Sequence, residues 1–393
     1  MTAVFLAPVY IALNAYIFLW FIRYMGACSH YFQRWYFGAA VLIIYSFFAF
    51  SILFAFLWPA RWLKHLSNIW FGMVAYILLT VATADLIRII LKYAVKVSPQ
   101  KLSSPRLFIV NGTLVILVIA FFTVYGYFHA RNIRVTSYSV SIDKECGSRD
   151  SLRVVLAADL HLGSNMGNLQ MKQMVKKINS QNPDLVVIAG DIFDNDFDAL
   201  ENPEKLAATL RGIHSACGVY ACYGNHDIQE KILAGFTFDP KGKKTSDPRM
   251  DAFVKKAGIT LLRDEYVLID DSFYLYGRAD RERPGRGIDQ RKTPSELTDG
   301  LDLRKPLFVI DHEPDELGEL SEAGVDLDLC GHTHDGQIFP GNIIIRFFWE
   351  NSCGYLKKGT MHNIVTSGVG VFGPNMRVGT KSEICTIDIQ FRS

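Results

Sequence analysis

The sequence has 393 residues, half of them apolar, and its 41 Lys and Arg nearly balance its 39 Asp and Glu. A net charge of +2 lacks the basic excess with which nucleic-acid-binding proteins contact phosphates, so the composition argues against that class. Apolar residues crowd the first 130 positions, whereas charged residues and histidines crowd the remainder. This asymmetry predicts an N-terminal domain over 1–130, a polar connector over 131–150 and a second domain over 151–393.

Four stretches of the N-terminal part are long and apolar enough to cross a bilayer, which takes about 20 apolar residues in a helix. They are residues 3–22, 35–58, 69–90 and 107–128. Trp20, Trp35, Trp58 and Trp70 stand near their ends, and the amphipathic indole ring favours the headgroup level. We therefore expect an α-helical transmembrane domain of four spans, in an integral multi-pass protein whose first partner is the lipid bilayer.

A charged pair, Asp85 and Arg88, stands near the end of the third stretch. A separation of three residues puts both on one helix face. Lys92 and Lys96 follow soon after, so we expect a structural ion pair close to the membrane interface rather than a functional site.

The side of the membrane is predicted from Lys and Arg in short loops, which are enriched on the cytoplasmic side. With four spans, five of these residues lie on the side of the C-terminal domain and six on the opposite side. The count favours a C-terminal domain outside the cytoplasm. The seven cysteines point the other way, because exported domains usually pair their cysteines or lack them.

Beyond residue 150, short apolar runs alternate with amphipathic stretches. The predicted strands are 152–158, 184–189, 219–223, 259–269, 273–277, 307–310, 325–330 and 384–391. The predicted helices are 169–178, 203–213, 248–257 and 314–323. Strands that alternate with helices predict an α/β fold with a sheet covered on both faces.

Polar clusters follow five of these runs at the point where each predicted strand ends. In an open α/β sheet the carboxyl ends of the strands share one rim, where ligands bind. We expect the following side chains to meet there: Asp159, His161, Asp191, Asn225, His226, His312, His332 and His334. Carboxylates and imidazoles without thiolates suit two divalent ions, Mn, Fe or Zn, with Mn favoured. Two such ions can clamp both oxygens of a phosphoryl transfer.

The blocks Asp159-Leu160-His161, Gly190-Asp191, Gly224-Asn225-His226-Asp227 and Gly331-His332-Thr333-His334, with His312, occur in this order along the chain. In this pattern the sequence resembles the calcineurin-like metallophosphoesterase superfamily, most closely the membrane-attached bacterial phosphoesterases of the YkuE type. The resemblance covers about 152–389. It implies a fold of two β-sheets sandwiched together and flanked by helices, and a place in the bacterial cytoplasmic membrane.

The resemblance also implies a role for each matching residue. Asp159, His161, Asp191 and His334 would hold the first metal; Asp191, Asn225, His312 and His332 would hold the second, so that Asp191 bridges. A metal-bound hydroxide would attack phosphorus. His226 would be the general acid, and Asp227 would orient its imidazole as a carboxylate behind a histidine does.

Several further residues admit two interpretations. Asp194 either supports the site or caps the following helix. Arg278 and Asp280 in a charged loop, and Arg377 in a glycine-rich segment, either bind a substrate phosphate or belong to solvated loops. The chain also carries Asp335-Gly336-Gln337 where many relatives have two glycines, which leaves the role of Asp335 open.

We therefore expect a membrane-bound hydrolase of phosphate monoesters, diesters or pyrophosphates, acting on a phosphorylated and possibly lipid-linked substrate. One alternative is a membrane sensor or transporter regulated by a metal-binding domain, and another is a metal-binding scaffold without catalysis. The substrate and the oligomeric state stay open.

Overall fold

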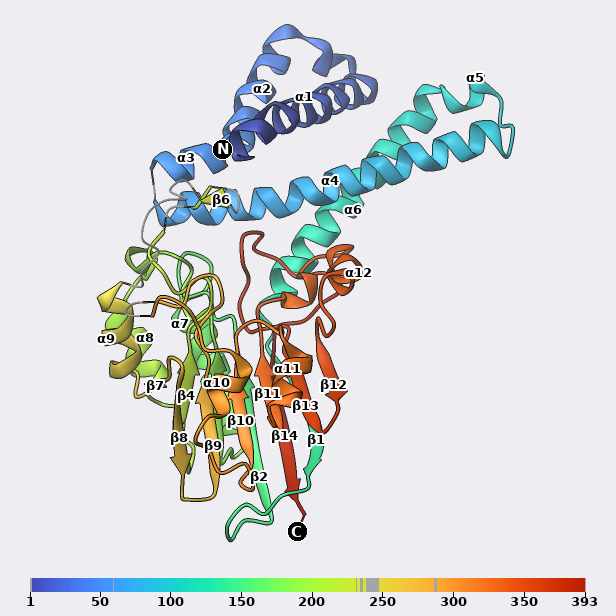
Figure 1. The fold of residues 1–393 in the computed structure, drawn as a ribbon. Coiled ribbons are helices and arrows are strands. Elements are labelled where there is room, and N and C mark those ends of the chain that lie inside the picture. The colour runs from blue at the N-terminus through green and yellow to red at the C-terminus, as the bar shows by residue number, and fades with distance from the viewer. Residues whose placement is uncertain are drawn as a thin grey trace. The chain divides into compact units, whose positions relative to one another are not determined.

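The protein is described by a computed structural model over residues 2–58, 60–230, 232–233, 236–237, 247–285 and 288–392. The chain divides into two compact units (Figure 1). The first unit comprises Met1–Phe128, Ile232–Phe238 and Gly373–Met376. The second comprises His129–Lys231, Asp239–Phe372 and Arg377–Ser393.

Helices make up most of the first unit. They are α1 (Thr2–Cys28), η1 (His30–Gln33), α2 (Trp35–Ala49), α3 (Ser51–Leu57), α4 (Arg61–Tyr93), α5 (Pro99–Leu102) and α6 (Pro105–His129), accompanied by the short strands β5 (Ile232–Leu233) and β6 (Phe236–Thr237). In the described part of the chain, three helices are long and apolar enough to cross a membrane: Ala7–Cys28, Arg61–Tyr93 and Pro105–His129. Few of their side chains are buried, as expected of helices that face lipid rather than a protein core.

The second expected span differs from the prediction, because it is broken into α2 and α3 with a bend of 51°. The break falls at Phe50, and the hydroxyl of Ser51 donates to the carbonyl oxygen of Phe48 at 2.6 Å. A serine hydroxyl that bonds back to its own helix competes with the backbone ladder and bends it. The number of helices that could span a membrane is therefore three, or four if the bent pair counts as one span.

The helices of the first unit pack through a small apolar cluster and a polar one. Ile17 of α1, Ile77 of α4 and Val115 of α6 are buried together. Asn14 accepts from Tyr45 Oη at 2.9 Å and donates to the carbonyl of Tyr10 at 2.8 Å, so this buried amide is satisfied. Asp85 accepts from the hydroxyl of Tyr16 at 3.3 Å.

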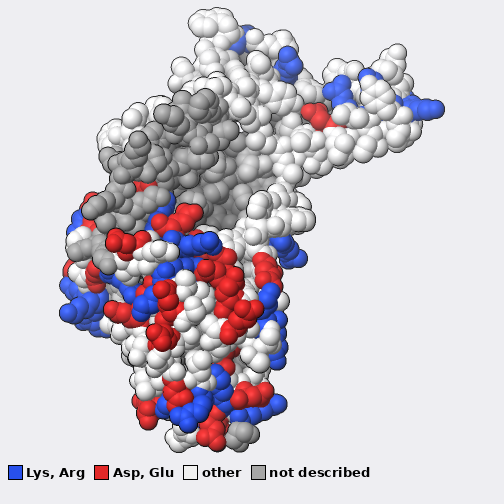
Figure 2. All heavy atoms as spheres, in the orientation of Figure 1, with Lys and Arg blue, Asp and Glu red and all other residues white. Residues whose placement is uncertain are grey.

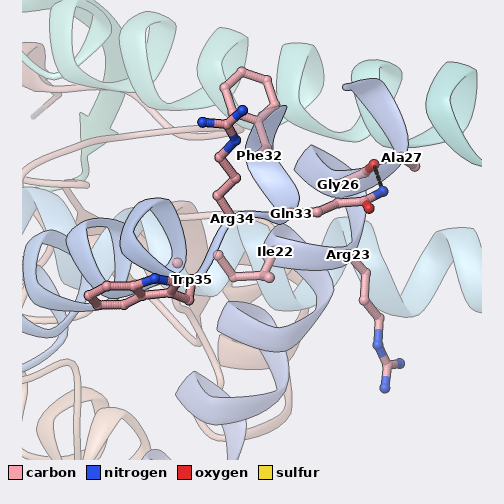
Figure 3. A pocket seen from close by; sticks show the side chains of 9 residues that line it. Ile22, Arg23, Gly26, Ala27, Phe32, Gln33, Arg34 and Trp35 are labelled. Carbon is pink, nitrogen blue, oxygen red and sulfur yellow. Dashed lines mark hydrogen bonds between the residues drawn. The ribbon is translucent and has the colours of Figure 1, made fainter. Parts of the chain in front are cut away.

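A hollow of about 520 Å³ lies between the end of α1 and the start of α2 (Figure 3). Gln33 closes one side, with its side-chain amide donating to the carbonyl of Gly26 at 2.9 Å. Arg23 and Arg34 also line the hollow, but their guanidinium groups point in opposite directions. They therefore do not form a joint anion site.

The first sheet of the second unit has six strands in the order β1-β14-β2-β3-β4-β7. Strands β2, β3, β4 and β7 are parallel, and β14 runs antiparallel to β2. The bounds are β1 (Arg134–Ile142), β2 (Ser151–Ala157), β3 (Leu185–Ala189), β4 (Val219–Cys222), β7 (Thr260–Leu261) and β14 (Glu383–Phe391). Strand β1 lies within the predicted connector 131–150, where it pairs in parallel with β14 as an edge strand.

The second sheet has six strands in the order β12-β13-β11-β10-β9-β8. Its central strands β9, β10, β11 and β13 are parallel, and both edge strands are antiparallel. The bounds are β8 (Glu265–Ile269), β9 (Phe273–Gly277), β10 (Leu307–Ile310), β11 (Leu327–Cys330), β12 (Gly354–Lys358) and β13 (Met361–Val365).

The two sheets pack face to face, as the alternation of buried side chains shows. Val154 and Leu156 of β2 share a core with Phe308 and Ile310 of β10. Intervening residues of the first sheet pack against α7 (Asn168–Asn179), α8 (Pro203–Leu210) and α9 (Pro248–Lys256). Those of the second sheet pack against α10 (Pro294–Thr298) and α11 (Leu317–Glu322). The predicted sandwich of two sheets flanked by helices is confirmed.

Charge is distributed unevenly between the two units (Figure 2). Lys, Arg, Asp and Glu are dense over the visible face of the second unit, whereas the first shows only scattered charges among uncharged side chains. This is the pattern expected when one unit is solvated by water and the other by lipid.

Candidate metal centre

All seven side chains predicted as metal ligands follow the carboxyl ends of central strands. Asp159 and His161 follow β2, and Asp191 follows β3. Asn225 follows β4, His312 follows β10, and His332 and His334 follow β11. Both sheets thus deliver side chains to one rim of the sandwich.

The backbone turns sharply at these positions. Five of the seven residues have positive φ, between 42° and 72°: Asp159, His161, Asp191, His332 and His334. Residues other than glycine rarely adopt this left-handed conformation, and it costs about 1–3 kcal/mol each. Strain of this kind gathers at functional sites, where the surrounding fold holds it in place.

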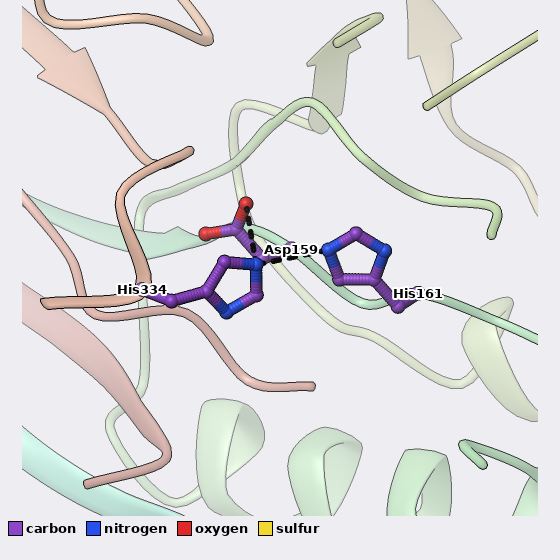
Figure 4. A group of neighbouring side chains, drawn as sticks. All are labelled: Asp159, His161 and His334. Atoms are coloured by element: carbon purple, nitrogen blue, oxygen red, sulfur yellow. Dashed lines mark hydrogen bonds and ion pairs between the residues drawn. The ribbon is translucent and has the colours of Figure 1, made fainter. Parts of the chain in front are cut away.

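One group of side chains is formed by Asp159, His161 and His334, which we call the first cluster (Figure 4). The Nε2 atoms of His161 and His334 lie 3.0 Å apart, and His334 Nε2 lies 3.7 Å from Asp159 Oδ1. The three side chains come from two sheets and point toward one another.

Asn225, His312 and His332 form the second cluster. Asn225 Oδ1 lies 3.1 Å from His312 Nε2 and 3.2 Å from His332 Nδ1, and these two nitrogens are 3.2 Å apart. Asp191 stands between the clusters, because its Oδ2 is 3.2 Å from His312 Nε2 and 3.7 Å from His161 Nε2.

These donors fit divalent cations by chemistry and by orientation. Two imidazole nitrogens at 3.0–3.2 Å, as in both clusters, share one proton at most, whereas both can donate a lone pair to one cation. His312 Nδ1 faces the carbonyl oxygen of Ala189 at 2.9 Å, which leaves Nε2 as the lone-pair donor. His161 Nδ1 lies 3.7 Å from Asp194 Oδ1, so Asp194 stands behind this imidazole as metal-ligating histidines require.

Burial controls the charge of the site. It lowers the pKa of the candidate ligand His332 to about 3, which favours the neutral imidazole that a metal needs, and it also lowers the pKa of His226 to about 4. At His312 the neighbouring carboxylate of Asp191 outweighs burial and raises the pKa of the imidazole. Burial also raises the pKa of Asp159 to about 6, because Asp159 and Asp191 are fully enclosed side by side. Two buried carboxylates need a cationic partner, and a metal would supply it.

The imidazole of His226 lies beside the first cluster, with its ring centre 5.1 Å from that of His161 and 4.4 Å from that of Phe372. Its Nδ1 contacts Asn195 Oδ1, and the Asn195 backbone N–H donates to the His226 carbonyl at 3.1 Å. A side-chain amide can offer its oxygen or its nitrogen to Nδ1, so Asn195 can support either protonation state of the ring. The sequence prediction missed Asn195, whose only signal is its place directly after Asp194.

The predicted role of Asp227, to orient the imidazole of His226, is wrong. Its carboxylate accepts from the backbone N–H of Phe193 at 2.9 Å and of Gly224 at 2.8 Å. It therefore ties the loops after β3 and β4 together, and Asn195 takes the place behind His226.

Arg278 does not face the site. Its side chain is fully buried and pairs with Asp311 at 2.6 Å and with Glu316 at 2.7 Å. It has no exposed surface to offer a substrate, so the predicted substrate contact is wrong. Asp280 is also buried, and its Oδ1 accepts from the backbone of Glu282 and Arg283.

Arg377 is fully buried as well, but it contacts the first cluster. Its guanidinium donates to the His334 carbonyl at 3.1 Å and lies 3.1 Å from His334 Nδ1. Its remaining bonds go to the carbonyls of Ser367, Gly368 and Gly370 and to the hydroxyl of Thr380. Arg377 thus positions His334 and the glycine-rich loop instead of binding substrate directly.

Gln337, which follows Asp335 and Gly336, has a definite partner. Its side-chain amide donates to the carbonyl of Phe372 and accepts from the Phe372 backbone N–H, both at 2.9 Å. It thereby holds Phe372 against His226. Asp335 is half-buried, and burial raises its pKa to about 6.

Comparison with known proteins shows what part of the second unit is similar to. Residues 152–336 match the family model described as calcineurin-like phosphoesterase. A transmembrane protein with metallophosphoesterase domain from Danio rerio is 29% identical over 290 residues, which are 70% of this chain and 61% of that protein. The chain thus spans less than two thirds of this relative's length. The uncharacterized metallophosphoesterase Cj0846 of Campylobacter jejuni is 26% identical over 370 residues, 88% of this chain and 90% of that protein.

A third relative carries a named activity. The UDP-2,3-diacylglucosamine pyrophosphatase LpxG of Chlamydia trachomatis is 25% identical over 239 residues, 52% of this chain and 70% of that protein. The resemblance indicated by the sequence blocks is thereby confirmed.

Proposed function

We propose that the chain is a membrane-bound phosphate ester hydrolase that uses two divalent cations, on the basis of the match of residues 152–336 to the calcineurin-like phosphoesterase family. The observation that carries the proposal is the carboxylate of Asp191, one oxygen of which faces both clusters. The first cluster would hold one cation and the second cluster the other, with Asp191 shared. Mn²⁺ is the ion we expect first, since carboxylate, amide and imidazole ligands without thiolate suit it.

The bound cations would supply Lewis acidity toward the phosphoryl oxygens and a water nucleophile at neutral pH. The residues of the chain do the rest. His226 would face the substrate and give a proton to the leaving oxygen, or stabilise charge on the phosphate. Asn195 holds its ring from behind, and Asp191 Oδ1 accepts the His226 backbone N–H at 2.8 Å, which couples this loop to the shared ligand.

A lipid or lipid-linked phosphate is the substrate class that we propose. Three or four apolar helices precede the phosphoesterase domain, which is more than attachment needs. The Chlamydia trachomatis relative is named for a substrate that carries acyl chains and a pyrophosphate. Both observations favour a substrate that resides in the membrane.

We also propose a location, namely the bacterial cytoplasmic membrane with the second unit outside the cytoplasm. The excess of Lys and Arg in the opposite loops supports this side when four spans are counted.

The test is hydrolysis by the purified full chain in detergent micelles, with p-nitrophenyl phosphate, bis-p-nitrophenyl phosphate, a phospholipid and UDP-diacylglucosamine as substrates. Treatment with EDTA should abolish turnover and Mn²⁺ should restore it. His226→Ala should lower kcat by about 10²–10⁴ while metal content is kept. Asn225→Ala should lower both metal content and rate. The absence of turnover on all four substrates with metal bound, or equal rates in all three proteins, would refute the proposal.

A further inference from the structure

Between the last candidate ligand and β12 the chain makes an apolar excursion over residues 338–349. It contains α12 (Gly341–Ile344) and η4 (Ile345–Phe347). Five of its eight large apolar side chains are exposed: Phe347 is 83% and Phe348 74% exposed, and Phe339, Ile343 and Ile344 are exposed as well. A contiguous apolar surface of this kind marks an interaction site rather than ordinary protein surface.

The exposed side chains of α12 and η4 share one side of the short helical stretch. Ile343, Ile344, Phe347 and Phe348 follow at intervals of one, three and one residues. At about 100° per residue they span an arc of about 140°, so they form a single apolar face. Arg346 lies between them in sequence and is also exposed.

Both ends of the excursion belong to the metal centre. It begins after η3 (His334–Gly336) and Gln337, whose amide holds Phe372 against His226. It ends at Trp349, whose ring centre lies 5.2 Å from that of the candidate ligand His332, with the rings edge to face. A molecule bound to the apolar face is therefore separated from the candidate metal-binding clusters by only a short stretch of chain at either end of the excursion.

The excursion is also tied to the residue at which the last membrane helix ends. The Phe339 backbone N–H donates to Val378 at 2.8 Å. Two residues on, the Thr380 carbonyl lies 3.0 Å from His129 Nε2, and Ser382 Oγ donates to Ala130 at 2.8 Å. His129 is the last residue of α6, which is long and apolar enough to span a bilayer. The hydrogen-bonded loop 378–382 thus links the excursion to His129 and Ala130, at the end of α6 in the chain.

We propose that the excursion 338–349 docks on the bilayer, with Phe347, Phe348 and the isoleucines of α12 inserted at the boundary between headgroups and acyl chains. The composition supports a lipid surface, because apolar and aromatic residues flanked by Arg are typical of interfacial segments. Exposed Arg134 and Arg346 would favour anionic headgroups. This inference rests on the proposed membrane function. It would explain how a lipid substrate reaches the metal centre, because docking of the excursion brings lipid phosphates beside His332.

The experiment uses the full chain in vesicles of three parts phosphatidylcholine to one part phosphatidylglycerol with labelled acyl chains. Phe347 is replaced by the photoreactive p-benzoylphenylalanine, and the control replaces Tyr266 in the same way. Tyr266 is an aromatic residue of β8, 50% exposed, at the opposite edge of the second sheet from β12. On irradiation, we expect lipid adducts at position 347 in at least tenfold excess over position 266.

Equal lipid adducts at the two positions would overturn the inference, and so would adducts at position 347 to a second protein molecule instead of lipid. The readout does not depend on turnover. An adduct specific to position 347 in a protein that hydrolyses nothing would uphold the docking surface and refute the proposed hydrolysis. Turnover together with equal lipid adducts at the two positions would uphold the proposed hydrolysis and refute the docking surface.

Discussion

At the scale of single residues, the imidazole of His226 depends on one amide. Asn195 contacts Nδ1 through its side chain and the His226 carbonyl through its backbone N–H. Because this residue sits behind the ring, its loss should leave the clusters intact and let the imidazole rotate.

We expect Asn195→Ala to lower kcat by about 10- to 100-fold, as the loss of a partner behind a functional histidine does. KM and metal content should change little, and both are measured on the Mn²⁺-loaded protein with a soluble diester. The control is Asn202→Ala, which removes the cap of α8 and should cost about 1 kcal/mol of stability without slowing the reaction. An unchanged kcat in Asn195→Ala would show that His226 needs no such support.

Asp227 should matter for stability rather than for chemistry. Its replacement by Ala leaves the buried N–H groups of Phe193 and Gly224 without acceptors, at about 1–3 kcal/mol each. We expect a lower unfolding temperature of the full chain, measured in EDTA so that metal loss does not contribute. Asp198→Ala, at an exposed ion pair with Arg249, should change stability by less than about 0.5 kcal/mol. An unaltered unfolding temperature with a large loss of kcat would restore the role in orienting His226.

The candidate ligands could be predicted from sequence because each follows an apolar run that ends at the same rim of the fold. Their partners could not. Asn195 is 31 residues from His226, and Arg377 is 43 residues from His334, so only the folded backbone brings them together. Arg278 was misjudged for the same reason, since its partners Asp311 and Glu316 lie 33 and 38 residues away and bury it.

At the scale of elements, glycines at the strand ends leave the space that the ligands occupy. A Cβ atom on Gly224, after β4, would lie 2.4 Å from Asp191 Oδ1 and 2.6 Å from the ring of His312. Neither neighbour can withdraw, because both are fully buried. Position 224 therefore requires a glycine, because Asp191 and His312 lie too close to its backbone for a Cβ atom to fit.

We therefore expect Gly224→Ala to remove at least one of two bound metal ions, counted by elemental analysis, while circular dichroism shows an intact fold. The control is Gly318→Ala in α11, where the nearest atom to the new Cβ lies 3.9 Å away. This change should retain both ions and stabilise the helix by up to about 1 kcal/mol. Full metal content in Gly224→Ala would mean that the clusters tolerate displacement.

Two elements could not be predicted from local pattern. The break at Phe50 lies within an uninterrupted apolar run, so hydropathy does not detect it, and the bond from the Ser51 hydroxyl back to the Phe48 carbonyl is of the kind that often bends helices. Strand β1 reads as a polar connector because its side chains alternate and face solvent in part. Its partner β14 begins at Glu383, far along the chain, so the pairing leaves no local signal.

At the scale of the whole molecule, the bent pair α2–α3 decides on which side the second unit lies. If the pair crosses the bilayer, both termini lie on the same side. The loops on that side carry five Lys and Arg, namely Arg61, Lys64, Arg131, Arg134 and Lys144. The loops on the opposite side carry six, namely Arg23, Arg34, Lys92, Lys96, Lys101 and Arg106. If the pair turns back, the termini lie on opposite sides. Arg23 and Arg34 then lie on the side of the second unit, which carries seven Lys and Arg, whereas the opposite side carries four.

The positive-inside rule thus gives opposite answers for the two topologies, outside the cytoplasm for four spans and inside for three. We expect four spans, because α2 and α3 together are apolar over the length that a span needs and only the 51° bend interrupts them. Alkaline phosphatase fused to either terminus should then be active, and green fluorescent protein at the same positions should stay dark. Fluorescence at the C-terminus with phosphatase activity at the N-terminus would instead show that α2–α3 turns back and that the phosphoesterase unit faces the cytoplasm.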